Sequence, residues 1–142
     1  MKNTLGKINQ EKINEIGEKY DLRFLILYGS ASKNKLNEKS DIDIAFFGND
    51  ELSFEQQLEL SSDLSSNIQI GYRILDLVDL KIANPLLKYE ITQGGKLLYG
   101  DETDFADYQV FAFKNYIDGE SLRNLEKLMI KKRQKALAGA IT

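Results

Sequence analysis

Four stretches of the chain have the apolar pattern of β-strands. Residues 22–28 are apolar almost throughout, which predicts a strand buried on both faces of a sheet. Residues 41–47 alternate two acids with isoleucines and a phenylalanine, and this period of two predicts a strand with one polar and one apolar face. Residues 68–80 predict a longer third strand, and residues 96–99 a short fourth one.

The first two helices are predicted from apolar spacing and from a start signal. Residues 7–20 predict an amphipathic helix that packs on the sheet. Ser53 and Gln56 have the spacing of a capping box, which begins a helix over residues 54–64. The side chains expected to face the core are Ile8, Ile13, Ile16 and Tyr20 in the first helix, and Phe54, Leu58 and Leu64 in the second.

Two further helices are expected in the second half of the chain. Pro85, the only proline, fits the first turn of a helix over residues 85–93 that ends at Gly94-Gly95. Residues 103–138 predict a long helical tail, with a possible break near Gly119. An apolar stripe runs along this helix, and we expect it to pack on the core. The stripe consists of Phe105, Tyr108, Phe111, Ala112, Tyr116, Leu122, Leu125, Leu128 and Met129.

This order of elements predicts an α/β (α+β) fold with a small mixed sheet flanked by helices. The chain has 142 residues. We expect one domain over residues 1–102, with a C-terminal helical extension over residues 103–142 packed on it. No apolar run approaches the roughly 18 residues of a membrane span. The N-terminus lacks the apolar core of a signal peptide, so we expect a cytoplasmic protein.

Composition narrows the chemistry that the chain can perform. With no cysteine and no histidine, it cannot form disulfides or use thiolate or imidazole groups as ligands or catalysts, so a general base or metal ligand has to be a carboxylate. The net charge is −3, which weighs against a nucleic-acid duplex as a direct ligand.

The two acids of the second strand are the first chemical signal. Asp41 and Asp43 share one face of the strand, where they repel each other unless a cation lies between them. Mg²⁺ suits such a pair because it binds carboxylate oxygens and leaves room for phosphate oxygens. Asp-x-Asp alone is more often a solvated face of a strand.

A phosphate-binding turn precedes the acid pair. Gly29-Ser30 follows the buried strand. A glycine turn of this kind exposes backbone N–H groups that can bind a phosphate, and the hydroxyl of Ser30 is a further donor. Gly-Ser alone is a common turn. Its occurrence about ten residues before the acid pair, with apolar strands on both sides, favours a functional interpretation of both.

Two later acids compete for a place beside the pair. Asp76 and Asp79 are three residues apart in the third strand, so they point to opposite faces and only one can join Asp41 and Asp43. Asp76 falls in the middle of the expected strand, where an unpaired acid is costly. Asp79 falls near its end, where the alternative is an exposed acid or a helix cap.

These motifs resemble the signature of the DNA polymerase beta superfamily of nucleotidyltransferases. The residues that carry the resemblance are Gly29-Ser30, a short spacer and the acid-x-acid strand at Ser40–Ala45. The short chain is most similar to the minimal nucleotidyltransferases (MNT group), which include the antitoxins of HEPN/MNT toxin–antitoxin pairs. Where the family often has arginine and glycine after Gly-Ser, this chain has Ala31 and Asn34, and Lys33 is the nearby basic residue.

The resemblance implies specific roles. Asp41, Asp43 and Asp76 would be catalytic residues and ligands of two Mg²⁺ ions, or of Mn²⁺, with Asp76 preferred over Asp79 because Asp76–Leu80 matches the family's third-acid pattern. Gly29, Ser30 and Lys33 would bind the nucleotide. The implied reaction is transfer of AMP from ATP to a tyrosine of a HEPN-type toxin.

Two alternatives stay open at the level of sequence. One is a nucleotidyltransferase that modifies a small molecule of the antibiotic type, and the other is an antitoxin that neutralises its partner by binding alone. The basic end of the tail, residues 127–135, is either a solvated helix end or a surface for RNA or an acidic protein. Nucleic acid is not expected as a direct ligand, although an RNA-processing partner is compatible with the family.

Overall fold

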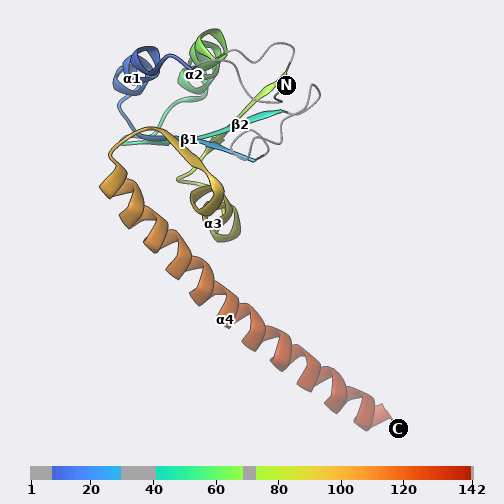
Figure 1. Cartoon of the computed structure of the whole chain (residues 1–142). Helices are drawn as coiled ribbons and strands as arrows, with labels where there is room; N and C mark the ends of the chain where they lie inside the picture. Colours follow the sequence, from blue (N-terminus) through green and yellow to red (C-terminus); the bar gives the residue numbers. More distant parts are fainter. Residues whose placement is uncertain (1–7, 30–40, 69–72, 142) are drawn as a thin grey trace, which may run out of the picture.

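A computed structural model describes residues 8–29, 41–68 and 73–141 of the chain. The described elements form an α/β fold of four helices around four strands, as the sequence predicts (Figure 1). In chain order they are α1 (Gln10–Lys19), β1 (Leu22–Tyr28), β2 (Ile42–Gly48), α2 (Phe54–Asn67), β3 (Leu75–Asp79), α3 (Pro85–Gly94), β4 (Lys96–Tyr99) and α4 (Glu102–Ile141).

The strands form one mixed sheet in the order β3-β2-β1-β4. Strand β1 pairs antiparallel with β2 along one edge and with β4 along the other, whereas β2 and β3 are parallel. Figure 1 shows α1 and α2 above the sheet, with α3 and the beginning of α4 below it. The sheet therefore separates two layers of helices.

Each face of the sheet carries its own hydrophobic core. Along β1, Leu25 and Leu27 point to the core under α1 and α2, while Phe24 and Ile26 point to the core over α3 and α4. All four side chains are buried, which confirms that this strand is covered on both faces. The expected core residues Ile13, Ile16 and Tyr20 of α1 are buried as well, and Ile8 packs against them.

The third strand is shorter than expected, and the helix before it is longer. Helix α2 continues to Asn67, and the N–H of Ile68 donates to the carbonyl of Leu64, so Ile68 closes this helix and does not begin a strand. The strand itself begins at Leu75, because the parallel partner β2 begins at Ile42 and these two residues pair.

Helix α2 presents Leu64 to the core, as expected, but not Phe54 and Leu58. The capping box of Ser53 and Gln56 is present, so Phe54 is the first helical residue. Phe54 and Leu58 are exposed, and their expected inward orientation is wrong. Leu60 and Leu64, one helical turn apart, are fully buried, because this is the face that the capped helix turns to the sheet.

Helix α4 is continuous, so the expected break near Gly119 is wrong. A single glycine costs a helix about 1 kcal/mol but does not end it. Only the first part of α4 packs on the sheet, through the buried side chains of Phe105, Tyr108 and Ala112. The rest extends away from the body of the protein (Figure 1). The division of the chain at residue 102 stays a prediction. None of the helices among the described residues is long and apolar enough to cross a membrane.

The expected core packing of the apolar stripe therefore fails for Phe111, which is 53% exposed, and for the whole second half of the stripe. Four residues of the stripe, Leu122, Leu125, Leu128 and Met129, are between 53% and 64% exposed. The physical reason is the size of the sheet, because four strands covered by α3 and the start of α4 offer no apolar surface farther along the helix.

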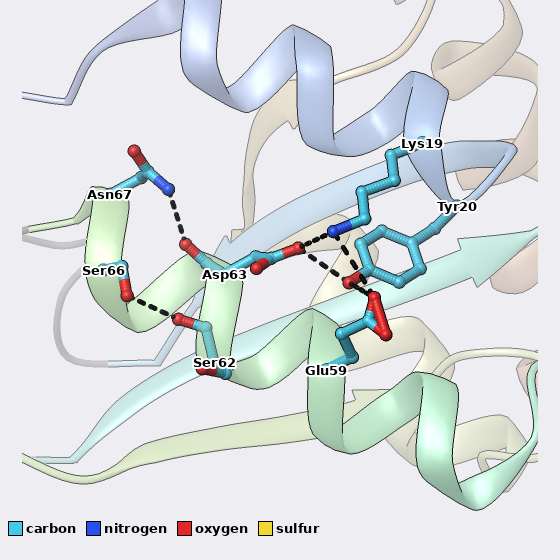
Figure 2. A network of polar contacts seen from close by, with 7 residues as sticks. All are labelled: Lys19, Tyr20, Glu59, Ser62, Asp63, Ser66 and Asn67. Carbon is cyan, nitrogen blue, oxygen red and sulfur yellow. Dashed lines mark hydrogen bonds and ion pairs between the residues drawn. The ribbon is translucent and has the colours of Figure 1, made fainter.

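A polar network joins α1 to α2 above the sheet (Figure 2). The hydroxyl of Tyr20 donates to the Oδ2 atom of Asp63 over 2.7 Å and lies 3.1 Å from Glu59 Oε2. The ammonium of Lys19 reaches the same Asp63 oxygen over 2.9 Å. These two bonds lower the pKa of the Asp63 carboxyl below its ordinary value. The charged form of Asp63 therefore stabilises the contact between the helices.

This network predicts a pH-dependent contribution to stability. Because the pKa of Asp63 is lower in the folded state, its contribution is fully present above the unfolded value of about 3.9 and is lost as pH falls through the folded value. We expect Asp63→Asn to lower the free energy of unfolding by about 1 kcal/mol at pH 7. Urea titrations should show this difference shrinking toward pH 3. Asp118→Asn, which changes an exposed acid of α4, is the control and should show no such pH-dependent difference.

Candidate active site

The turn after β1 is built around a glycine that lies against an acid. Gly29 has a φ of +72°, a backbone conformation that side chains with a Cβ rarely adopt. A Cβ atom at this position would lie 2.5 Å from the Oδ2 atom of Asp43. Glycine is therefore required twice, for the conformation of the turn and for the close approach of the backbone to the carboxylate.

Strand pairing brings the acids of two separate strands together. Asp43 of β2 pairs with Asp76 of β3 in parallel register, and on its other side it pairs with Tyr28 of β1. Paired residues of neighbouring strands point to the same face of a sheet. Asp41 directly precedes β2, and its side chain is exposed. Asp41, Asp43 and Asp76 thus gather at one end of the sheet, beside the Gly29 turn.

Burial and the close approach of the three acids raise the pKa of Asp43. Partial burial raises the pKa of Asp43, and the charges of Asp76 and then Asp41 raise it further. Partial burial also raises the pKa of Tyr28 to about 12, with smaller contributions from the charges of Asp43 and Asp76. The site consequently has an excess of negative charge that a cation would relieve.

Asp79 lies on the other face of the sheet, as its spacing from Asp76 predicts. It pairs with Phe46, whose side chain belongs to the core under α1 and α2, and its Oδ1 atom accepts a hydrogen bond from the N–H of Lys81 over 3.0 Å. Asp79 therefore caps the turn after β3. The role of Asp76 as third ligand stays a prediction.

The expectation that Asp76 is buried within a long strand is wrong. Asp76 is the second residue of β3, and its side chain is exposed. Among the strands of the described residues, β3 has one neighbour, β2, and so forms an edge of the sheet. Removing this charge is therefore not expected to relieve a large burial cost.

The remaining predicted site residues, Ser30 and Lys33, lie outside the described residues. Within residues 8–29, 41–68 and 73–141, no group of three or more acidic side chains is arranged so that it could hold a metal ion. The donor chemistry nevertheless fits Mg²⁺, since Asp41, Asp43 and Asp76 are carboxylates, and the charges of Asp76 and Asp41 are close enough to Asp43 to raise its pKa.

Tyr28 is the site residue that the sequence does not single out. It ends an apolar strand, and its cross-strand pairing with Asp43 is visible only once the antiparallel register of β1 and β2 is known. Its partly buried ring also packs against the core over α3 and α4. The side chain of Tyr28 therefore lies next to that of Asp43 on the same face of the sheet.

A pocket of about 430 Å³ lies at the other end of the same sheet face. Its lining includes Arg23, at the opposite end of β1 from Tyr28, so it is separated from the acids by roughly 16 Å at about 3.3 Å per strand residue. Arg23 is engaged by Asp104 through an ion pair and lies over the rings of Phe24 and Phe47. The pocket belongs to the junction between the sheet and α4, apart from the acids.

Comparison with known families gives a match over most of the sheet domain. The family model of the polymerase beta nucleotidyltransferases matches residues 11–104. A protein adenylyltransferase, MntA of Shewanella oneidensis, is 35% identical over 83 residues, which cover 58% of this chain and 58% of that protein. A putative protein adenylyltransferase of Methanocaldococcus jannaschii is 32% identical over 84 residues, 59% of this chain and 61% of that protein. The chain thus spans about six tenths of the length of these two relatives.

Solved structures resemble the chain over a larger part of its length. A crystal structure described as a toxin–antitoxin with AMP-PNP has a TM-score of 0.67 and 28% identity, covering 86% of this chain and 99% of the other. A complex of a tri-AMPylated HEPN toxin with an MNT antitoxin, from Shewanella oneidensis, has a TM-score of 0.60 and 27% identity, covering 84% and 95%. The expected polymerase beta-like fold is therefore confirmed.

The Gly29 turn leads to a prediction about stability and local geometry. Gly29→Ala places a Cβ against Asp43 in a strained conformation, and we expect it to lower the free energy of unfolding by about 1–3 kcal/mol. Chemical denaturation measures this change. Gly139→Ala is the control, because a Cβ there meets no atom within 4 Å and alanine favours the helix. Equal stability of the Gly29→Ala variant and the wild type would contradict the close approach.

Proposed function

Because the chain belongs to the polymerase beta nucleotidyltransferase family, on a match over residues 11–104, we propose that it transfers AMP from ATP to a tyrosine of a HEPN-type toxin. The observation that carries the proposal is the pairing of Asp43 with Asp76, with Asp41 nearby, directly beside the Gly29 turn. Phosphoryl and nucleotidyl transfer need carboxylates and backbone donors in this arrangement more than they need a nucleophilic side chain.

The relatives support the choice of nucleotide and acceptor. One is named a protein adenylyltransferase, one was crystallised with AMP-PNP, and one contains a HEPN toxin that carries AMP groups. Another toxin–antitoxin structure is of a mutant in which two aspartates, two positions apart, are changed to glutamate. This spacing equals that of Asp41 and Asp43.

The nucleotide would be held at the turn. We assign the triphosphate to the backbone around Gly29, to the hydroxyl of Ser30 and to the ammonium of Lys33, because backbone N–H groups and a lysine together neutralise phosphate charge. Tyr28 pairs with Asp43 across the two strands and packs against the core over α3 and α4.

Asp41, Asp43 and Asp76 would hold two divalent cations, Mg²⁺ or Mn²⁺. When bound, such ions would supply electrostatic stabilisation of the phosphate charge. The like charges that raise the pKa of Asp43 are then compensated. The protein's own contribution is to position the three carboxylates on two paired strands.

The reaction balances without any further reactant. The phenolic oxygen of the acceptor tyrosine forms a bond to the α-phosphorus of ATP, and the bond from that phosphorus to the bridging oxygen of pyrophosphate breaks. The proton of the hydroxyl passes to the carboxylate of Asp76, which is exposed at the edge strand and accessible to a partner protein. Pyrophosphate leaves on the side of the Gly29 turn.

The acid pair leads to the first functional prediction. Asp43→Asn removes a charge at nearly constant volume, so we expect loss of AMP transfer by at least about 100-fold with the fold intact. In the absence of divalent cations its stability should equal or exceed that of the wild type, because the charge repelled by Asp76 and Asp41 is gone. Labelled ATP, Mg²⁺ and the purified toxin provide the transfer assay, with circular dichroism as the check of folding.

The same assay separates the alternatives. Label on the toxin that depends on Asp43 supports the proposal, whereas label on an aminoglycoside-type small molecule and not on protein would favour a small-molecule enzyme. Neutralisation of the toxin without any label, equally by the wild type and Asp43→Asn, would favour an antitoxin that acts by binding alone.

The opposite faces of Asp76 and Asp79 give the second functional prediction. We expect Asp76→Asn to abolish AMP transfer while ATP still binds, since Asp41 and Asp43 remain. Asp79→Asn is the matched control and should keep transfer within about threefold of the wild type, and the amide oxygen of asparagine can still accept the hydrogen bond from the Lys81 N–H. Transfer rates and calorimetric ATP affinity are the measurements. An essential Asp79 with a dispensable Asp76 would overturn the assignment.

A further inference from the structure

The pocket between the sheet, α3 and α4 plays no part in the proposed reaction. We call it the junction pocket. Its volume is about 430 Å³, which falls within the roughly 300–1,000 Å³ of pockets that bind small molecules. Its lining residues come from β1, β2, the turn after β3, α3 and α4. Because it lies at the other end of β1 from the acids, a ligand bound here would not contact Asp43 or Asp76.

Aromatic side chains line the junction pocket. The ring centroid of Tyr108, a buried residue, lies 5.3 Å from that of Phe47 and 5.6 Å from that of Phe111. Phe111 is nevertheless 53% exposed. An exposed aromatic ring beside a cavity offers a face on which a planar ring can stack. The junction pocket therefore favours a ligand that contains such a ring.

Two cationic side chains of the pocket are fixed in position. Arg23 donates two hydrogen bonds to Asp104, of 2.7 Å and 2.6 Å. The ammonium of Lys81 donates to the backbone carbonyl of Asn49 over 3.3 Å and lies 5.3 Å from the centroid of the Phe47 ring. Side chains that are already ordered lose less entropy when a ligand binds.

The lining of the junction pocket has an excess of positive charge. Lys81 and Lys88 form no ion pair with a carboxylate in the described part of the chain. The third cation, Arg23, is paired with Asp104, and the lining contains one acid, Asp107. Three positive and two negative groups leave a charge of +1, whereas the whole chain carries −3. The pocket therefore attracts an anion and repels a cation.

We propose that the junction pocket binds a nucleoside monophosphate. The base would stack on Phe111 beside Tyr108. The phosphate would pair with the ammonium groups of Lys81 and Lys88, and Asp107 would accept hydrogen bonds from the ribose hydroxyls. This inference goes beyond the proposed function and does not depend on it, because the pocket shares no residue with the acid site.

Other small ligands match fewer of these features. Inorganic phosphate would pair with the lysines but leave the ring of Phe111 exposed to water. An uncharged aromatic molecule would cover Phe111 but leave the ammonium groups of Lys81 and Lys88 without an anion. A nucleoside monophosphate combines the ring, the anion and the hydroxyl donors in one molecule.

A ligand in the junction pocket would contact three layers of the fold at once. Phe47 belongs to β2, Lys88 to α3 and Phe111 to α4, and Figure 1 shows both helices on the same side of the sheet. A ligand that binds only the folded state stabilises it by mass action. AMP should therefore raise the Tm, and the increase should grow with its concentration.

Calorimetric titration of the full chain with AMP tests the proposal, with GMP and UMP titrated in parallel. EDTA is present so that no divalent cation occupies the acid site. We expect one bound nucleotide per chain, and a dissociation constant that rises about 10-fold in Lys88→Gln, because a charge-assisted hydrogen bond is lost. Phe111→Ala should also weaken binding about 10-fold, because the base loses its stacking partner.

Lys12→Gln is the matched control, since it makes the same change on α1, across the sheet from the pocket, and should alter the dissociation constant by less than about twofold. Ribose 5-phosphate, which lacks the base, and adenosine, which lacks the phosphate, should each bind at least about 10-fold more weakly than AMP. Circular dichroism checks that each variant is folded.

Several results would overturn the junction pocket as a nucleotide site. They are absence of binding by all three nucleotides, equal affinity of Lys88→Gln and the wild type, and ribose 5-phosphate binding as tightly as AMP. Asp43→Asn should bind AMP with wild-type affinity, and tighter binding by this variant would instead locate AMP at the acids. Loss of AMP transfer has no bearing on these titrations, because they contain neither ATP nor an acceptor.

Discussion

The double burial of β1 is the constraint on which the rest of the structure depends. This strand pairs on both edges and is covered on both faces, so each of its central side chains, Phe24 to Leu27, has one required direction. A shift of one residue would exchange the two cores. The register of β2 against β1 follows, and with it the place where the chain leaves the sheet at Gly29.

The active-site candidate arises where this well-packed strand ends. In the sheet the local rules of sequence and packing agree, but around Asp43 they conflict, because three acids gather and a partly buried carboxylate has a raised pKa. Such local conflicts are typical of functional sites. The left-handed conformation of Gly29 and its close approach to Asp43 are part of the same local conflict around the acids.

The molecule also separates charges along its length. The acidic body holds the carboxylates that the proposed reaction needs, whereas residues 122–139 of α4 concentrate positive charge. The beginning of α4 is held to the sheet by Arg23, which pairs with Asp104 and lies over the rings of Phe24, Phe47 and Tyr108.

The sequence by itself determined the order of the elements, the exact strand from Leu22 to Tyr28, the capping box at Ser53 and the opposite faces of Asp76 and Asp79, because these depend on local periodicity and turn chemistry. Tertiary structure decided what depends on partners. The pairing of Tyr28 and Asp76 with Asp43 needs the order of the strands, and the start of β3 needs the end of β2. The exposure of Leu125 likewise follows from the small size of the sheet, and the sequence of α4 alone does not show how far the sheet extends.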